Sequence, residues 1–395
     1  MPGSFKKIGK VLFSKVFTNI FAPALDIVPQ LPKLEARGNR PLQMTFEDQL
    51  RVLVYFHLQE HKSGRHLLQE LEENDFARAV IAPEAGIKKS SFSEVINTRG
   101  LEQLIVLFEK LQLKAAKRIP QKDKHLGDLV AIDGSVIEAV PSMHWADYSQ
   151  TQKKAKVHLG FDLNRGIPRK IILTDCKVDE RPFVSQLLEK GQTGVTDRNY
   201  QKYSKFDTWQ AEGKHFACRI RADAIKTVLK DNEIKPDSPV FYDAIVLLGI
   251  PKVNQTKEKV RVVAYRVKNI DYWVATDRFD LSAEDVANIY KLRWDIETFF
   301  AWWKRHLKVY PIIARSKYGL MVQLLAGLIT YLLLAIYCHE EYKERVSIKR
   351  VRELRIKILN ETRTIQEKVA KKAKDKYLNP GFPNEQLFFQ LHAKT

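Results

Sequence analysis

Apolar residues recur at helical spacing through the first 125 residues. Three helices are expected there, at Phe46–Leu71, Ser91–Arg99 and Leu101–Lys117. An interruption of the first at Ser63-Gly64 is left open. Thr45 fits the N-cap of the first, because acids follow it in the first turn, and Ser90 or Ser91 fits the N-cap of the second. The second helix follows a basic turn, as a DNA-recognition helix would, although an ordinary surface helix has the same pattern.

Short apolar runs replace this pattern from Leu129 onward. Eight strands are expected, at Leu129–Asp133, Lys156–Phe161, Lys170–Thr174, Gly194–Asp197, His215–Ile220, Val240–Leu248, Val260–Val267 and Tyr272–Thr276. A turn-rich segment joins the second and third, which predicts a hairpin. Helices are expected at Phe183–Glu189 and Tyr203–Glu212. The alternation of strands and helices indicates an α/β fold.

A long amphipathic helix is predicted from Ser282 to about His306, with Ser282 as its N-cap. At about 100° per residue, its polar residues Tyr290, Arg293, Glu297 and Lys304 fall within an arc of about 60°, opposite an apolar face. A solvated surface stripe would have the same pattern, since Arg293 and Glu297 form an i,i+4 pair.

The segment Gly319–Cys338 is nearly long and apolar enough to cross a bilayer. A fully buried core helix is the alternative that we favour, because no second such segment is present and the N-terminus lacks the features of a signal peptide. The last part of the chain, 341–395, holds 14 Lys and Arg against 7 Asp and Glu, and a basic helix is expected at Ser347–Ile358.

Charge favours a polyanionic partner. The 395 residues include 66 Lys and Arg against 47 Asp and Glu, a formal charge of +19, and nucleic acid is the commonest partner of so basic a protein. The 45% hydrophobic content excludes a collagen-like or wholly disordered chain. Three scattered cysteines exclude a disulfide framework or a zinc site and fit a reducing compartment.

Two carboxylates end predicted buried strands. Asp133 and Asp197 occupy these positions, where the side chains of open sheets reach the ligand-binding crevice. If Glu297 joins them from its helix, three acids converge on one site. Carboxylate oxygens suit Mg²⁺, and two such ions can drive phosphodiester chemistry.

The spacing Tyr290-x₂-Arg293-x₃-Glu297-x₆-Lys304 resembles the Y-R-E-K signature of bacterial DDE transposases of the insertion-sequence-four type. The segment 132–135 (IDGS) resembles the first-Asp motif of that family, and 196–200 (TDRNY) resembles the second. Asn199 occupies the position where the family usually has Gly, so the resemblance does not predict the geometry of the turn at this position. The resemblance covers roughly 125–340.

The resemblance implies an RNase H-like catalytic core at 126–340 with a β-rich insertion at about 214–277. A helical DNA-binding domain would precede it at 1–125, and a basic helix and tail would follow at 341–395. It also implies a bacterial enzyme that acts on cytoplasmic, nucleoid-associated DNA as a homodimer, without a membrane partner. The run Leu320–Tyr337 would pack on the sheet as a buried helix.

The same resemblance assigns roles to the site residues. Asp133, Asp197 and Glu297 would bind two Mg²⁺ or Mn²⁺ ions and catalyse cleavage at transposon ends, followed by joining of the 3′-hydroxyl to DNA. Tyr290, Arg293 and Lys304 would contact DNA, and Trp273 would stack on a flipped base. Two alternatives remain open: an inactive or domesticated DNA-binding protein, and a standalone nuclease with the same core.

Overall fold

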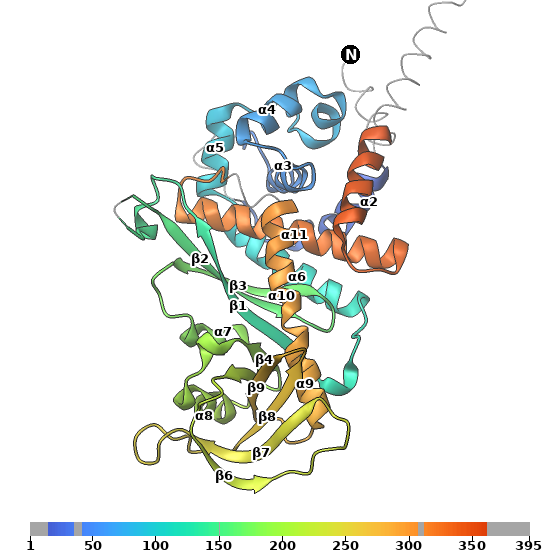
Figure 1. Ribbon diagram of the computed structural model, residues 1–395. Coiled ribbons are helices and arrows are strands. Elements are labelled where there is room, and N and C mark those ends of the chain that lie inside the picture. The colour runs from blue at the N-terminus through green and yellow to red at the C-terminus, as the bar shows by residue number, and fades with distance from the viewer. Residues whose placement is uncertain (1–14, 35–41, 150, 307–311, 362–395) are drawn as a thin grey trace, which may run out of the picture.

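The computed structural model describes residues 15–34, 42–149, 151–306 and 312–361. These residues form a mixed nine-stranded sheet with helices on both faces and a layer of helices at one end (Figure 1). The architecture is α/β, as the sequence predicts.

The helical layer comes from the N-terminal part of the chain. Its helices are α2 (Lys15–Leu25), α3 (Phe46–Leu58), α4 (Gly64–Glu73), α5 (Lys89–Thr98) and α6 (Leu101–Arg118). Thr45 caps α3 in a capping box with Asp48, which confirms the predicted start. The interruption left open at Ser63-Gly64 is present, because Ser63 caps a new helix that begins at Gly64. The predicted serine cap of α5 is wrong, since that helix begins at Lys89 without a side-chain cap.

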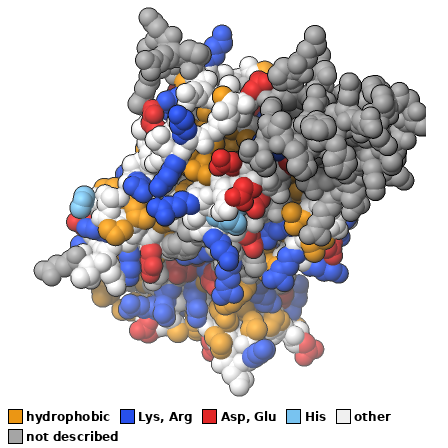
Figure 2. Space-filling view, turned by 90° about the horizontal axis from the view of Figure 1, so that it is seen from above, with side chains coloured by type: hydrophobic (Ala, Val, Ile, Leu, Met, Phe, Trp, Pro, Cys, Tyr) orange, Lys and Arg blue, Asp and Glu red, His pale blue; other side chains and the backbone are white. Residues whose placement is uncertain are grey.

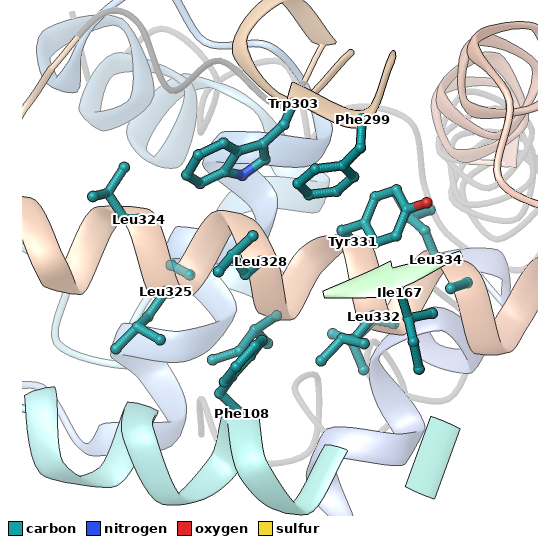
Figure 3. Packing of buried hydrophobic residues seen from close by; sticks show 14 of the residues in the cluster. Phe108, Ile167, Phe299, Trp303, Leu324, Leu325, Leu328, Tyr331, Leu332 and Leu334 are labelled. Atoms are coloured by element: carbon teal, nitrogen blue, oxygen red, sulfur yellow. The ribbon is translucent and has the colours of Figure 1, made fainter. Parts of the chain in front are cut away.

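Helix α11 (Lys317–Tyr342) is the apolar segment that could have spanned a membrane. It is long and apolar enough to do so, and 94% of its most apolar window is buried inside the protein. In Figure 3, Phe299 and Trp303 lie on one side of α11 and Phe108 of α6 lies on the other. The structure therefore makes it a core helix. It packs mainly on α6, α3 and α5 and meets the sheet at β3, so the expected packing on the sheet is only part of its environment.

The sheet has the strand order β3-β2-β1-β4-β5-β9-β8-β7-β6. The strands are β1 (Leu129–Glu138), β2 (Lys154–Asp162), β3 (Ile167–Asp175), β4 (Thr193–Thr196), β5 (His215–Ile220), β6 (Lys226–Asp231), β7 (Val240–Leu248), β8 (Val260–Val267) and β9 (Ile270–Thr276). The predicted hairpin of β2 and β3 is confirmed, and β1, β4 and β5 run parallel. The expected insertion extends this same sheet.

Strand β6 escaped sequence prediction because it lies at the edge of the sheet and five of its six residues are exposed. A strand that buries no face carries no clear alternation of apolar and polar residues.

The two faces of the sheet are covered differently. Leu129 and Ala131 of β1 point to the larger hydrophobic cluster, which includes α10, α11 and the N-terminal helices. Val130 and Ile132 point to a smaller cluster that is covered by α7 (Val184–Leu187) and α8 (Tyr203–Ala211). One hydrophobic core thus joins the helical layer to the first face of the sheet.

The helix predicted to run unbroken from Ser282 is interrupted at one residue. Arg293 separates α9 (Ala283–Leu292) from α10 (Trp294–His306), and its backbone N–H donates to the carbonyl of Tyr290, three residues back, at 3.2 Å. A bond to the residue three positions back is the tighter 3₁₀ type of turn, although the backbone of Arg293 keeps helical angles. The capping box of Ser282 and Asp285 confirms the predicted start.

Leu328 tests the role of α11 as the shared core. Leu328→Ala is expected to lower the free energy of unfolding by about 2–5 kcal/mol, because the side chain is fully buried and its loss leaves a cavity. Leu113 of α6 is 59% exposed, so Leu113→Ala should change it by about 0.5 kcal/mol or less. Urea denaturation of both variants checks this. Equal effects would show that α11 is not the core.

Candidate active site

The register of β1 and β4 brings the two aspartates together. Ala131 is paired with Val195 in the parallel ladder, so continuing the register by two residues sets Asp133 beside Asp197. Neighbouring strands lie about 4.8 Å apart. Side chains two residues apart on a strand share a face, so both carboxylates lie on the face of Ala131, which α10 covers.

Asp133 is held in an unfavourable electrostatic environment. Burial raises the pKa of its carboxyl group to about 7, and the charges of Asp197 and Glu297 add to this rise. A hydrogen bond from the Gly134 N–H at 2.8 Å and the charge of Arg293 act in the opposite direction. Asp197 and Glu297 therefore both lie within electrostatic range of Asp133.

Asp197 caps a short 3₁₀ helix, Arg198–Tyr200. Its side chain accepts a hydrogen bond at 2.9 Å from the N–H of Asn199. Residues of a 3₁₀ helix have negative φ, so Asn replaces the family's Gly at this position without strain.

Glu297 lies in the first turn of α10 and is bound by Arg293. The Arg293 Nη2 atom lies 2.6 Å from Glu297 Oε1. The Arg293 guanidinium lies 5.5 Å from the centre of the Tyr290 ring, and its Nε donor is buried without a partner among the described residues. Tyr290 itself is buried, which raises its pKa to about 12. The predicted i,i+4 salt bridge between Arg293 and Glu297 is therefore present. It does not use the Nε–H donor of Arg293.

Lys304 connects α10 to the end of β1. Its Nζ donates to the carbonyl of Val136 at 2.8 Å. Burial lowers its pKa, and the negative charge of Asp133 partly offsets this. Lys304 therefore lies within electrostatic range of the acids.

Trp273 does not lie with the acids. It packs against the cluster on the other face of the sheet, where Lys226 Nζ lies 4.5 Å from its ring centre and Tyr242 lies 5.1 Å away. Tyr272 is the aromatic residue on the acids' face, and its ring centre is 6.2 Å from that of Tyr290. Adjacent residues of a strand point to opposite faces, so Tyr272 faces the acids and Trp273 faces away from them. The structure therefore does not bring Trp273 together with the acids.

Arg219 is a site residue that the sequence did not single out. It follows Cys218, which is paired with Thr196 in the last pair of the β4–β5 ladder, and its guanidinium lies 4.8 Å from the centre of the Tyr272 ring. Only the register of the strands could have shown this.

The donor set fits a divalent cation. Carboxylate oxygens are the ligands that Mg²⁺ prefers. A cation would stabilise the charged form of Asp133, whose pKa is raised mainly by burial and further by the charges of Asp197 and Glu297. Among the described residues, no three His, Cys, Asp or Glu side chains lie close enough together to hold an ion directly. Any ion bound here would therefore need further ligands, such as water.

A polar groove of about 970 Å³ begins next to Asp197. Its cationic lining residues are Arg181, Arg198, Lys202, Arg221 and Lys257, against two aspartates. Asp207 of α8 accepts hydrogen bonds from the backbone N–H groups of Lys257 and Glu258, and Gln201 accepts one from that of Arg221. These bonds tie the walls together, so the groove is preformed and its surplus charge is positive.

Comparisons with known proteins show the family to which the chain belongs. Residues 124–333 match the family described as the transposase DDE domain. A probable transposase for insertion sequence element IS5377 of Geobacillus stearothermophilus is 27% identical over 332 residues, which cover 80% of this chain and 82% of the relative. A putative transposase for insertion sequence element IS4SA of Synechocystis is 24% identical over 260 residues, which cover 62% and 71%.

One solved structure is also similar, that of the piggyBac transposase in a synaptic complex with hairpin DNA. It is 12% identical, the alignment covers 96% of this chain and 86% of that one, and the TM-score is 0.43.

The family match extends over more than half of the chain and includes Asp133, Asp197 and Glu297. The chain belongs to the transposase DDE domain family and is a DNA transposase of the insertion-sequence kind. The predicted family and activity are therefore confirmed, and DNA is its partner as it is for the family.

Asp133 makes the stability of the metal-free protein depend on pH. The folded protein holds its proton up to about pH 7, whereas the ordinary pKa is 3.8. The stability that this gives is complete below about pH 4 and is lost as the pH rises toward 7. Asn imitates the neutral acid, so the melting temperature of Asp133→Asn minus that of the wild type should increase from pH 4 to pH 8 in EDTA.

Asp179→Asn is the matched control. Hydrogen bonds from Arg181 hold the pKa of Asp179 below its usual range, so this difference should move the opposite way or stay constant. A difference for Asp133→Asn that does not change with pH would contradict the electrostatic account.

Proposed function

We propose that this transposase cleaves phosphodiester bonds at transposon ends and joins the freed 3′-hydroxyl to DNA, with Asp133, Asp197 and Glu297 as its catalytic acids. The adjacency of Asp133 and Asp197 across the β1–β4 register carries the proposal. The strand order β3-β2-β1-β4-β5, with parallel β1, β4 and β5, supports an RNase H-like core at 126–340.

Two divalent cations, Mg²⁺ or Mn²⁺, are the cofactors of this proposal. When bound, they supply positive charge that neutralises the phosphate and activates the attacking oxygen. Asp133 and Asp197 bind them from the strand ends. Glu297 does so from α10 once its carboxylate is released from Arg293.

Arg293 binds a DNA phosphate near the cleaved bond. It has a buried Nε donor without a partner among the described residues, and a guanidinium can hold a phosphate through two parallel hydrogen bonds. Tyr290 and Lys304 support it from the same face, and Lys304 contacts DNA at the end of β1.

The DNA strand leaves the acids along the polar groove. Groove residue Arg198 directly follows Asp197, and the groove has the positive surplus that phosphates require. Stacking of Trp273 on a flipped base near the cleaved bond has no support from its position, because its ring packs under Lys226 and against Tyr242 on the face opposite the acids. Lys and Arg side chains are also numerous on the helical end seen in Figure 2, which fits a DNA-binding role for 1–125.

Pairing of two transposon ends requires two active sites, so the enzyme acts as a homodimer on DNA. Its place of action is the bacterial cytoplasm, on the nucleoid. The buried position of α11 supports the expectation that no membrane takes part.

Removal of any catalytic acid tests the reaction. Asp133→Ala, Asp197→Ala and Glu297→Ala should each reduce Mg²⁺-dependent cleavage of end-containing DNA at least about 10³-fold, because each removes an oxygen ligand. DNA affinity in EDTA should survive. The substrate is a duplex that carries the inverted repeats flanking the gene.

Joining of a pre-cut end to target DNA separates a transposase from a nuclease with the same core. Cleavage without joining by the wild type would favour the nuclease. Substantial cleavage by Glu297→Ala would remove Glu297 from the site.

Two groove residues test the DNA path. Arg221→Ala and Lys257→Ala should weaken affinity for duplex DNA of any sequence, and the double variant should flatten the slope of log affinity against log salt by about 2. Lys170→Ala is the control, since Lys170 lies in edge strand β3 and pairs with Glu189. Fluorescence anisotropy at several salt concentrations measures both. Equal slopes for the double variant and the wild type would exclude the groove.

A further inference from the structure

Exposed aliphatic side chains line part of the polar groove that begins next to Asp197. Val253 is 75% exposed, Ile225 is 52% exposed and Ile250 is 45% exposed. A single exposed aliphatic side chain is ordinary on a protein surface. These three are held together, because the N–H of Gly249 donates to the Ile225 carbonyl at 2.9 Å and the N–H of Val253 donates to the Ile250 carbonyl at 3.1 Å. They form an apolar patch within a groove whose surplus charge is positive.

The turn between β7 and β8 carries Ile250 and Val253 and is firmly built. The Ile250 carbonyl also accepts a hydrogen bond from the N–H of Asn254, and the Asn254 side chain accepts one from the N–H of Ile250 at 2.8 Å. The turn lies beside α8 (Figure 1), where Asp207 accepts a hydrogen bond from the N–H of Lys257 at 3.0 Å. The turn therefore presents its aliphatic side chains to the groove in a fixed arrangement.

The charges around the patch identify the chemistry of its partner. Arg221 and Lys257 line the same groove, and Lys252 is exposed within the turn itself. DNA offers phosphates to such cations and the apolar faces of its bases to aliphatic side chains. Proteins that bend DNA insert residues such as Ile and Pro between neighbouring base pairs, and here exposed Pro251 directly follows Ile250.

We propose that Ile250 and Val253 form a wedge that enters between neighbouring base pairs of duplex DNA in the polar groove and bends the duplex there. This rests on the DNA path proposed above. TA and CA steps are easily unstacked, whereas A-tracts are stiff, so the cost of opening a step depends on sequence. The wedge therefore gives the transposase a preference for flexible DNA without contact to any base edge.

Two other roles for the patch predict different results. An ordinary exposed turn contributes nothing to the affinity for DNA or to its shape. A patch that pairs two copies of this chain changes the oligomeric state of the protein when it is made polar.

Two duplexes of equal length and equal A·T content, one rich in TA and CA steps and one built from A-tracts, separate these roles. The full-length protein is mixed with each duplex in EDTA. Fluorescence anisotropy measures affinity, and energy transfer between dyes at the two ends measures the bend. The wild type should bend the flexible duplex and bind it more tightly than the stiff one.

The double variant Ile250→Ser/Val253→Ser removes the wedge and no charge. It should bind the flexible duplex about 10-fold more weakly than the wild type does, because its side chains no longer bury apolar surface. It should leave that duplex straight. Its affinity for the stiff duplex and its salt slope should equal those of the wild type, because the phosphate contacts remain.

Two control variants should behave as the wild type does. Ile250→Leu keeps an apolar side chain in the turn. Ile356→Ser/Leu359→Ser removes two aliphatic side chains that are similarly exposed, in the helix at 348–361 outside the groove. Melting temperatures check that every variant is folded, and sedimentation of the DNA-free protein reports its oligomeric state.

This proposal is overturned if the serine double variant bends the flexible duplex as the wild type does, or if the wild type binds both duplexes equally and bends neither. Loss of self-association in the serine variant would overturn it too, and would assign the patch to a contact between copies. If Arg221→Ala/Lys257→Ala leaves the DNA affinity and its salt slope unchanged, the groove itself is rejected, and the wedge with it.

Discussion

The parallel pairing of β1 with β4 is the constraint on which the active site depends. Its last pair is Ala131 with Val195, and Asp133 and Asp197 each follow two residues later, so the backbone pairing brings both aspartates to the place where the ladder ends. Since β4 stops at Thr196 while β1 continues to Glu138, a crevice opens where the two strands part, and ligands bind at such openings in open sheets. Glu297 and Arg293 enter that crevice from α10, which Lys304 fastens to β1.

The carboxylates of Asp133 and Asp197 carry like charges, and burying them near each other lowers the stability of the folded protein. The well-packed hydrophobic core compensates for this loss. The first face of the sheet, α10, α11 and the N-terminal helices share one hydrophobic cluster (Figure 3). Its burial offsets the electrostatic cost that is visible in the raised pKa of Asp133. The remaining repulsion between the acids favours binding of a cation.

Much of this could be predicted from the sequence. The end of β4 just before Asp197 and the start of the helix at Ser282 are local signals of apolar runs and caps, and the structure has them. The predicted strand end at Asp133 is wrong, because β1 continues to Glu138 along its pairing with β2. The break at Arg293 could not be predicted, because the helical periodicity continues across it.

The sequence also could not predict which face of the sheet a side chain points to, or which residues distant in sequence lie next to each other. The orientation of Trp273 depends on which face of its strand meets the acids, and Arg219 becomes a neighbour of Asp197 only through the β4–β5 register.

The position of α11 also sets the order in which the chain can complete its fold during synthesis. Helices α3, α5 and α6 emerge from the ribosome first, yet the apolar surface they share is covered by residues 317–342, which are made about 200 residues later. At about 5–20 residues per second, these helices wait roughly 10–40 s for their partner. The N-terminal region therefore depends on the C-terminal part of the catalytic region to become stable, and a nascent chain truncated before α11 exposes the surface that chaperones recognise.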